Sequence, residues 1–194
     1  MMKRVCVFCG SRPGTRPVYV ELARSMGRAL ARRGIGLIYG GGCVGLMGEL
    51  ADTIMANGGE VVGVIPRALV AREVAHRAIT ELLIVRSMHD RKARMADLAD
   101  GFVALPGGFG TVEEFCEVLA WAQLGLHQKP CGILNVEGYY DPLFALFDRA
   151  VADGFLHPIN RDLVLHAADP DALLDMLISY KSPASEKWID SEES

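Results

Sequence analysis

Residues 105–114 combine a glycine-rich turn, a hydroxyl residue and two carboxylates, and this combination could bind and act on a phosphorylated substrate. The stretch reads Leu-Pro-Gly-Gly-Phe-Gly-Thr-Val-Glu-Glu and follows an apolar segment. Glycines let backbone N–H groups approach an anion closely, and the start of the helix expected next adds unpaired donors and its dipole. The sequence therefore predicts an anion site at residues 107–111 with a carboxylate beside it.

The carboxylates of this stretch allow two interpretations. Thr111 and Glu114 have the spacing of a capping box, with Thr111 as N-cap and Glu114 returning to the N-cap N–H. Helical periodicity, however, places Glu114 on one stripe with Val118 and Trp121 and turns Glu113 outward. An inward acid at the start of a ligand-binding helix favours a catalytic role for Glu114.

A second charged group occurs at residues 87–92, Ser-Met-His-Asp-Arg-Lys. Ser87 and Asp90 have the spacing of a helix N-cap and its N3 acid. Arg91 then shares an apolar stripe with Met95, and burying an unpaired guanidinium would cost several kcal/mol. We therefore expect Arg91 to have an acidic partner, for which Glu114 is a candidate, or an anionic ligand. The alternative is an arginine that extends to solvent near the helix end.

An earlier glycine loop also follows a predicted strand. Gly40, Gly42 and Gly45 formally satisfy GxGxxG, a pattern typical of dinucleotide sites. Such a site also requires an acid at the end of the next strand to hold the ribose, but the strand predicted at 60–65 continues into Pro66 and an arginine. The other interpretation is a tight turn with close helix packing, and the missing acid argues against NAD.

The elements that position these groups alternate between strand and helix, which predicts an α/β fold: a Rossmann-like, doubly wound parallel sheet with helices on both faces. We expect one domain over residues 1–181 and a polar tail, mostly mobile, over 182–194. The long connection at 66–80 could cover a ligand. The predicted strands lie at residues 4–8, 36–39, 60–65, 81–85, 101–105, 131–135 and 163–166.

Composition excludes several partners. The chain has 194 residues, 51% of them hydrophobic, a net charge of −4 and a pI near 5.7, which argues against nucleic acid as the main partner. No apolar run approaches the ~20 residues of a membrane span, and the first residues lack the apolar core of a signal peptide.

Five scattered cysteines do not form a disulfide framework. Cys6 and Cys9 should point to opposite faces of one strand. We expect a cytoplasmic protein.

These motifs together resemble the Lonely Guy family of cytokinin riboside 5′-monophosphate phosphoribohydrolases, over nearly the whole chain. The family's PGGxGTxxE signature is present, and Trp121-Ala-Gln-Leu-Gly125 continues the match. The resemblance implies that Arg91 and Glu114 form the catalytic pair, 23 positions apart (114 − 91). The nucleotide contacts that it implies are Glu73, Arg91, Lys92, Gly107, Gly108, Phe109, Gly110, Thr111, Val112, Glu113 and Glu114.

The activity implied by the resemblance is hydrolysis of the N-glycosidic bond of N6-substituted adenosine 5′-monophosphates, giving a free adenine-type base and ribose 5-phosphate. The resemblance also implies a homodimer. The sequence contains no cluster of metal ligands, and we expect neither a metal nor a cofactor. Two positions depart from the family: Phe109 replaces a frequent tyrosine, and Ala120 stands where threonine is expected. Either change could shift substrate preference.

Three alternatives from other classes remain. Relatives often carry a lysine decarboxylase label, and a phosphate loop would also suit pyridoxal phosphate, which needs a Schiff-base lysine. Of the lysines in the chain, only Lys92 lies near the proposed site and could form the Schiff base. If it does not, Lys92 is a second phosphate contact or a surface residue. The second alternative is a non-catalytic nucleotide sensor in which Glu114 only caps a helix. The third is an AMP nucleosidase without preference for cytokinins.

Overall fold

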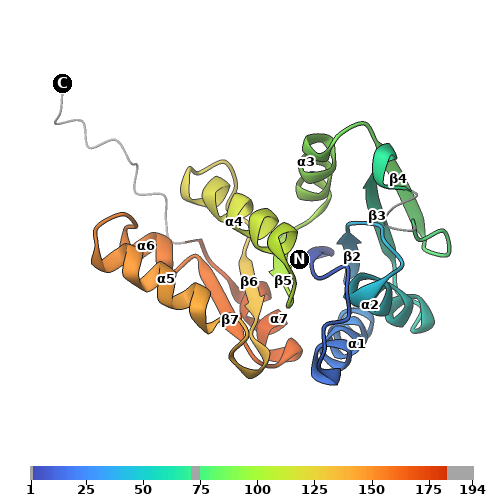
Figure 1. Ribbon diagram of the computed structural model, residues 1–194, viewed down its shortest axis with the longest axis horizontal. Coiled ribbons are helices and arrows are strands. Elements are labelled where there is room, and N and C mark those ends of the chain that lie inside the picture. Colours follow the sequence, from blue (N-terminus) through green and yellow to red (C-terminus); the bar gives the residue numbers. More distant parts are fainter. Residues whose placement is uncertain (1, 71–74, 183–194) are drawn as a thin grey trace.

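The computed structural model describes residues 2–70 and 75–182, which form a seven-stranded parallel sheet with helices on both faces (Figure 1). The predicted strands are confirmed, with ends that shift by at most one residue. The strands are β1 (Arg4–Phe8), β2 (Gly36–Tyr39), β3 (Val61–Pro66), β4 (Glu81–Val85), β5 (Gly101–Ala104), β6 (Cys131–Leu134) and β7 (Val164–Ala167). The helices are α1 (Pro17–Arg32), α2 (Gly45–Ala56), α3 (Met88–Leu98), α4 (Phe109–Gln123), α5 (Asp141–Ala152), α6 (Pro158–Arg161) and α7 (Pro170–Ser179), with short 3₁₀ turns η1 (Arg67–Leu69) and η2 (Val136–Gly138).

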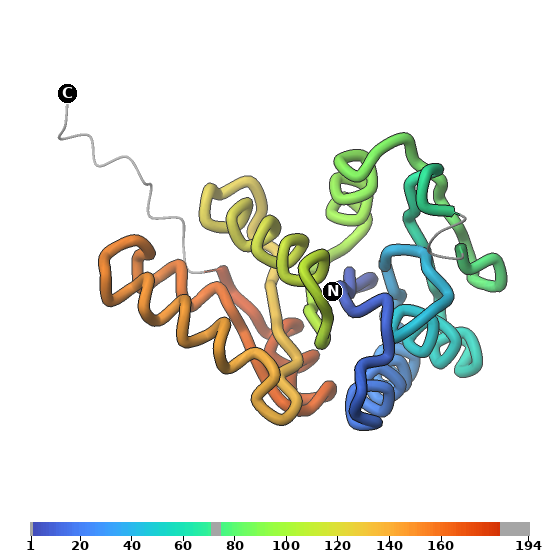
Figure 2. The backbone as a smooth tube through the Cα atoms, viewed as in Figure 1, coloured from blue at the N-terminus to red at the C-terminus, as the bar shows by residue number. Residues whose placement is uncertain are grey.

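The strand order is β4-β3-β2-β1-β5-β6-β7, so the direction of winding reverses between β1 and β5. The first half of the chain, blue to green, lies on one side of this reversal, and the yellow to red half lies on the other (Figure 2). Open α/β sheets bind ligands at such a reversal, outside the carboxyl ends of the strands. The doubly wound, Rossmann-like prediction is confirmed.

Two apolar layers cover the two faces of the sheet. Helices α1, α2 and α7 pack on one face, and α3, α4 and α5 pack on the other. Strand β1 shows the alternation between them: Val5, Val7 and Cys9 join the first layer, whereas Cys6 and Phe8 join the second. The prediction that Cys6 and Cys9 point to opposite faces is therefore confirmed, as the period of two in a strand requires.

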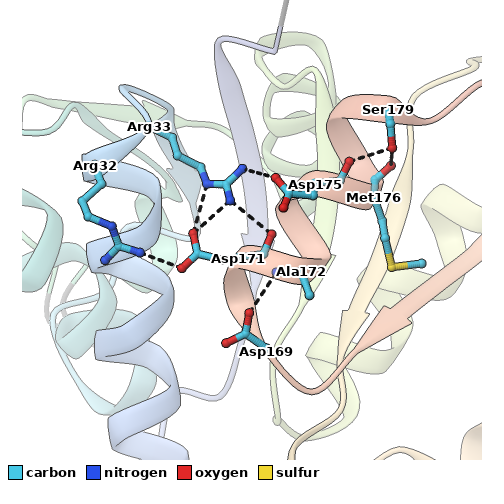
Figure 3. A network of polar contacts seen from close by, with 8 residues as sticks. All are labelled: Arg32, Arg33, Asp169, Asp171, Ala172, Asp175, Met176 and Ser179. Atoms are coloured by element: carbon cyan, nitrogen blue, oxygen red, sulfur yellow. Dashed lines mark hydrogen bonds and ion pairs between the residues drawn. The ribbon is translucent and has the colours of Figure 1, made fainter.

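An ion-pair network joins the end of α1 to α7 (Figure 3). Arg32 Nη2 lies 2.7 Å from Asp171 Oδ2, and Arg33 Nη1 lies 2.6 Å from Asp175 Oδ1. The hydrogen bond to Asp175 is the main cause that raises the pKa of Arg33. Asp169 caps α7 by accepting a hydrogen bond from the N–H of Ala172. Exposed pairs of this kind contribute about 0–1 kcal/mol each, so the network mainly fixes how the two helices pack.

His127 makes folding stability depend on pH. Its Nε2 lies 2.9 Å from the carbonyl oxygen of Val118, and its Nδ1 accepts from the N–H of Lys129, so the imidazole is held neutral. Burial lowers the pKa of His127 below its usual 6.5. His127 therefore binds a proton more tightly in the unfolded chain than in the folded protein. Its contribution to folding stability is present above about pH 6.5 and is lost as the pH falls below that value. Urea unfolding of the wild type between pH 5 and 8 should show this slope. His127→Gln should flatten it, and an unchanged slope would contradict the assignment.

Two predicted segments lie partly outside the described residues. In the 66–80 connection, η1 follows β3, residues 71–74 are not described, and Ala75 bridges to Gly42. Of the predicted tail, residues 183–194 are not described. Among the described residues, no helix is both long enough and apolar enough to cross a bilayer.

Candidate active site

Three loops meet at the carboxyl edge of the sheet, where the winding reverses. The N–H of Gly10, after β1, donates to the carbonyl of Pro106, after β5, over 3.0 Å. The carbonyl of Gly10 accepts from the N–H of Leu46 at the start of α2, also over 3.0 Å. Gly45 packs so tightly that a Cβ there would lie 2.3 Å from the carbonyl carbon of Ser11. Backbone contacts alone therefore join the loops that follow β1, β2 and β5.

Helix α4 starts at Phe109, with Gly108 as N-cap and no side-chain cap, so the predicted capping box of Thr111 and Glu114 is wrong. The glycine at 108 lets the helix begin three residues earlier than a Thr111 cap would. Thr111 then lies inside the first turn, 4% exposed, and is folded back against Gly107, where a Cβ would sit 2.1 Å from its Oγ1. Glu114 is thereby released from a capping role.

The start of α4 is open on its outer side. Apart from the adjacent residues and the backbone of α4 itself, no atom lies within 4 Å of a Cβ built on Gly108 or on Gly110, and Phe109 between them is 98% exposed. The first N–H groups of a helix have no partner within it. The glycines therefore leave room for an anion to approach these donors and the positive end of the helix dipole.

Buried charge is concentrated beside this opening. In the described part of the chain, the polar or charged residues that are buried are His76, Arg91, Thr111 and Glu114, and three of them belong to the predicted site. Glu114 is 9% exposed, while Glu113 faces solvent, so the periodicity prediction is confirmed. Burying a charge costs several kcal/mol unless it is compensated. A group of buried charged side chains beside an opening therefore indicates a functional site.

Arg91 is 5% exposed and lies against the loop after β2. A Cβ on Gly40 would lie 1.9 Å from Arg91 Nη2, so the missing side chain at Gly40 creates the space that the guanidinium fills. Met88 contributes a sulfur 3.8 Å from Arg91 Nη1. Ser87 caps α3 by accepting from the N–H of Asp90 over 3.0 Å, as predicted, which fixes the turn that carries Arg91.

The charges of Arg91 and Glu114 act on the same point of the sheet. Burial raises the pKa of the Cys6 thiol well above its usual value, the charge of Glu114 raises it further, and the charge of Arg91 opposes that. Burial also raises the pKa of Cys9, again with a smaller contribution from Glu114. Helices α3 and α4, which carry Arg91 and Glu114, both pack against β1 on the same face of the sheet. That Arg91 and Glu114 share one catalytic site stays a prediction.

Lys92 links the two helices that carry these charges. Its Nζ lies 2.7 Å from Glu113 Oε1 and 2.9 Å from Glu117 Oε1, and its side chain is 12% exposed. The hydrogen bond to Glu113 is the main cause that raises the pKa of Lys92. The pair joins α3 to α4 on the side of Glu113, away from Glu114. A Schiff base forms from a neutral amine, so this environment disfavours the pyridoxal phosphate alternative.

The glycines of the earlier loop are explained by packing. Gly40 accommodates Arg91, Gly45 lies on the β1 loop, and Gly42 pairs with Ala75. His76 holds the same loop, since its N–H donates to the carbonyl of Gly41 over 2.8 Å. These contacts favour the second interpretation of the GxGxxG pattern, a tight turn with close packing.

The remaining predicted contacts are distributed unevenly. Val112 is half-buried on α4, and Glu73 lies outside the described residues. Two residues that the sequence analysis missed also meet the loop: Tyr139 and Tyr140 donate hydrogen bonds to the carbonyls of Gly107 and Leu105, each over 2.6 Å. They follow β6, so they lie at the same carboxyl edge as the glycine loops. That position was the signal that could have identified them.

Gly40→Ala is expected to lower catalysis at least tenfold without unfolding the protein, because the new methyl group takes the place of the Arg91 guanidinium and the reacting groups lose their alignment. Gly36→Ala, at the start of the strand that precedes Gly40, is the matched control, since its Cβ would meet side-chain atoms of Glu60 and Arg4 and not the guanidinium of Arg91. Steady-state rates and thermal melting of both variants would check this. Equal activity of Gly40→Ala and the wild type would contradict the prediction, because it would show that catalysis does not depend on the position of the Arg91 guanidinium.

Comparisons with known proteins cover most of the chain. The family model described as "Possible lysine decarboxylase" matches residues 47–177. LOGL9 of Oryza sativa subsp. japonica, named a probable cytokinin riboside 5′-monophosphate phosphoribohydrolase, is 53% identical over 178 residues, which are 92% of this chain and 78% of that protein. LOG7 of Arabidopsis thaliana, named a cytokinin riboside 5′-monophosphate phosphoribohydrolase, is 49% identical over 179 residues. These residues are 92% of this chain and 82% of LOG7.

Solved structures support the fold alone. The molybdenum cofactor binding protein from Rippkaea orientalis aligns with a TM-score of 0.69 at 20% identity, over 92% of this chain and 97% of that one. The Moco carrier protein from Chlamydomonas reinhardtii aligns with a TM-score of 0.68 at 22% identity, over 92% and 98%. Because relatives with about half their residues identical cover nearly the whole chain, the chain belongs to the Lonely Guy family, whose members are named cytokinin riboside 5′-monophosphate phosphoribohydrolases.

Proposed function

We propose that this protein hydrolyses the bond between N9 of an N6-substituted adenine and C1′ of ribose 5′-monophosphate, releasing the base and ribose 5-phosphate. The observation that carries the proposal is the pair of buried charges, Arg91 and Glu114, beside a helix start that opens toward solvent between Gly108 and Gly110. The family relatives named above support the same reaction and a nucleotide substrate.

In this proposal the 5′-phosphate binds at the loop and first helical turn of residues 107–111. The N–H groups there can accept a dianion without a metal, because the helix dipole and unpaired donors favour negative charge. Phosphate binding holds the ribose in a fixed orientation, and C1′ then lies toward the buried Glu114. Positioning of this kind supplies a large part of a hydrolytic enzyme's advantage.

Glu114 is proposed to stabilise the positive charge that develops on the ribose as the C1′–N9 bond breaks. It also orients the attacking water and accepts its proton, while the water oxygen forms the new bond to C1′. The electron pair of the broken bond leaves with the base, which takes up a proton. Because Glu114 is only 9% exposed, its carboxylate interacts with a developing cation more strongly than it would in bulk water.

Arg91 is proposed to keep Glu114 ionised by placing a permanent positive charge near it. Its guanidinium could also stabilise the departing base or contact the phosphate. The side chain is anchored against Gly40 and Met88, so it presents its charge from a fixed position. Phe109 and Val112 on α4, together with Lys92, Glu113 and Glu73, stay predicted substrate contacts.

A competition experiment tests the substrate. With equal amounts of AMP and N6-isopentenyl-AMP, chromatography of the released bases should show mainly isopentenyladenine. Mainly adenine would indicate a general AMP nucleosidase. Binding of both nucleotides with no base released would contradict hydrolysis and leave a nucleotide-sensing module. A lysine decarboxylase would instead need pyridoxal phosphate, and its absorbance and borohydride trapping would reveal it.

We also propose a homodimer in the cytoplasm. Phe155, which is 86% exposed, lines a groove of about 250 Å³ between α4, α5 and α6, together with apolar side chains such as Leu119 and Phe147. Contact with a second copy would remove them from water. Light scattering at working concentration should give twice the chain mass. The described cysteines are free thiols, which supports a reducing compartment.

A further inference from the structure

Every carbonyl group from Leu105 to Gly108 accepts a hydrogen bond. The carbonyl of Leu105 accepts from the Tyr140 hydroxyl over 2.6 Å, and that of Pro106 accepts from the N–H of Gly10 over 3.0 Å. Gly107 accepts from the Tyr139 hydroxyl over 2.6 Å, and Gly108 accepts the first helical bond of α4, from Val112, over 3.2 Å. The acceptor side of this loop is therefore fully occupied by the protein.

The geometry of the peptide bond then determines where the N–H donors of this loop point. The described peptides are trans, and in a planar trans peptide the N–H points opposite to the C=O. Holding the carbonyl of Gly107 therefore turns the N–H of Gly108 away from Tyr139. Apart from its two chain neighbours, no residue has an atom within 4 Å of a Cβ at Gly108, so the residue that follows the held carbonyl borders open space. The hydroxyl of Tyr139 thus sets the direction of one donor at the anion site.

The turn after β6 explains how two successive tyrosines reach the same loop. Glu137, in η2, adopts a positive φ of 49°, which is costly for a residue with a side chain, and Gly138 follows at 71°. Arg16, in the β1 loop, forms an ion pair with the carboxylate of Glu137. Asn135 then accepts a hydrogen bond from the N–H of Tyr140 over 2.8 Å. The strained turn is held at both ends and delivers both hydroxyls to the loop.

The two tyrosines differ in burial, and this separates their roles. Tyr140 is 3% exposed and belongs to the apolar layer under α5, so its loss would disturb the core. Tyr139 is 38% exposed and packs edge-on against Tyr140 and against Tyr19 of α1, with ring centres 4.9 and 5.6 Å apart. Water can replace the hydroxyl of Tyr139 without leaving an unsatisfied buried group, so this residue can be tested without unfolding the protein.

We propose that Tyr139 is a positioning residue of the anion site: by holding the carbonyl of Gly107 it directs the Gly108 N–H at the phosphate of the ligand. The identity of that phosphate as the 5′-phosphate of a nucleotide rests on the proposed function. Tyr139 itself touches no reacting atom. Its effect is therefore confined to ligands that carry the phosphate.

Calorimetric titration with ribose 5-phosphate tests the proposal on the intact protein. Tyr139→Phe should weaken binding about five- to twentyfold, as expected when one hydrogen bond to a charged group loses its alignment. Tyr19→Phe is the matched control, because it removes a hydroxyl from the same aromatic cluster and, in the described part of the chain, Tyr19 forms no hydrogen bond through that group. Adenosine, which lacks the phosphate, should bind equally to the wild type and to Tyr139→Phe.

The outcomes separate this proposal from the proposed function. If the wild type releases no base but Tyr139→Phe still binds ribose 5-phosphate more weakly than Tyr19→Phe, hydrolysis fails and the positioning role stands. Binding of ribose 5-phosphate within twofold of the wild type would overturn the positioning role whether or not the protein is an enzyme. Equal weakening for adenosine and ribose 5-phosphate would also overturn it, since that pattern indicates a general disturbance of the fold. With isopentenyl-AMP as substrate, KM should rise and kcat should change little.

Discussion

Glu114→Gln is expected to lower kcat for base release by about 10²–10⁴-fold, the range for loss of a group that transfers a proton in the transition state. Glutamine keeps the shape of the side chain but cannot take a proton from water or carry the charge that stabilises the ribose cation. KM should change little, because the phosphate and loop contacts are untouched. Steady-state kinetics on isopentenyl-AMP, with thermal melting to confirm folding, measures the effect.

Glu117→Gln is the control for this substitution. It lies one turn further along α4, is part of the Lys92 bridge with Nζ 2.9 Å from its carboxylate, and is partly exposed. Its loss should remove about 0–1 kcal/mol of stability and leave kcat nearly unchanged. If Glu114→Gln and Glu117→Gln were equally active, the buried carboxylate would have no chemical role, and Glu114 would be structural only.

Arg91→Met is expected to lower kcat/KM by about 10²–10³-fold, the range for removing one preorganised electrostatic group from an active site. Methionine fills much of the space against Gly40 but removes the positive charge that we propose keeps Glu114 ionised. Arg91→Lys should recover only part of the loss, because an ammonium group lacks the planar fork of donors.

Arg94→Met on the same helix controls for the loss of a positive charge. Arg94 is exposed and lines a separate groove beside β4, together with Arg86 and Asp97. Its substitution should leave the rate of base release unchanged. Comparable losses in Arg91→Met and Arg94→Met would indicate that net charge alone governs substrate binding, against a specific role for Arg91.

The fold was predictable because strongly apolar segments alternate with helical stripes along the chain. The positions of Arg91 and Glu114 followed from the same periodicity, since a charge on an apolar stripe must lie inward. Ser87 was identified as an N-cap because its hydroxyl and the N3 acid have a specific spacing, and it accepts from the N–H of Asp90 as expected.

The remaining features depend on contacts between distant segments. Thr111 has the spacing of a cap, but Gly108 lets α4 begin earlier, and space against Gly107 decides where the hydroxyl lies. Lys92 has no signal in its own helix that points to Glu113 and Glu117, 21 and 25 positions away. Tyr139 reaches Gly107 across 32 positions through a turn with positive φ, which local propensities do not predict.

We propose above that the buried residues Arg91 and Glu114, beside the glycine loop, break an N-glycosidic bond. The most direct test quantifies both products from N6-isopentenyl-AMP, using the wild type and Glu114→Gln at equal concentration. The wild type should form isopentenyladenine and ribose 5-phosphate in a one-to-one ratio, and Glu114→Gln should form neither at a comparable rate. Release of inorganic phosphate and the riboside, or undiminished base release by Glu114→Gln, would contradict it.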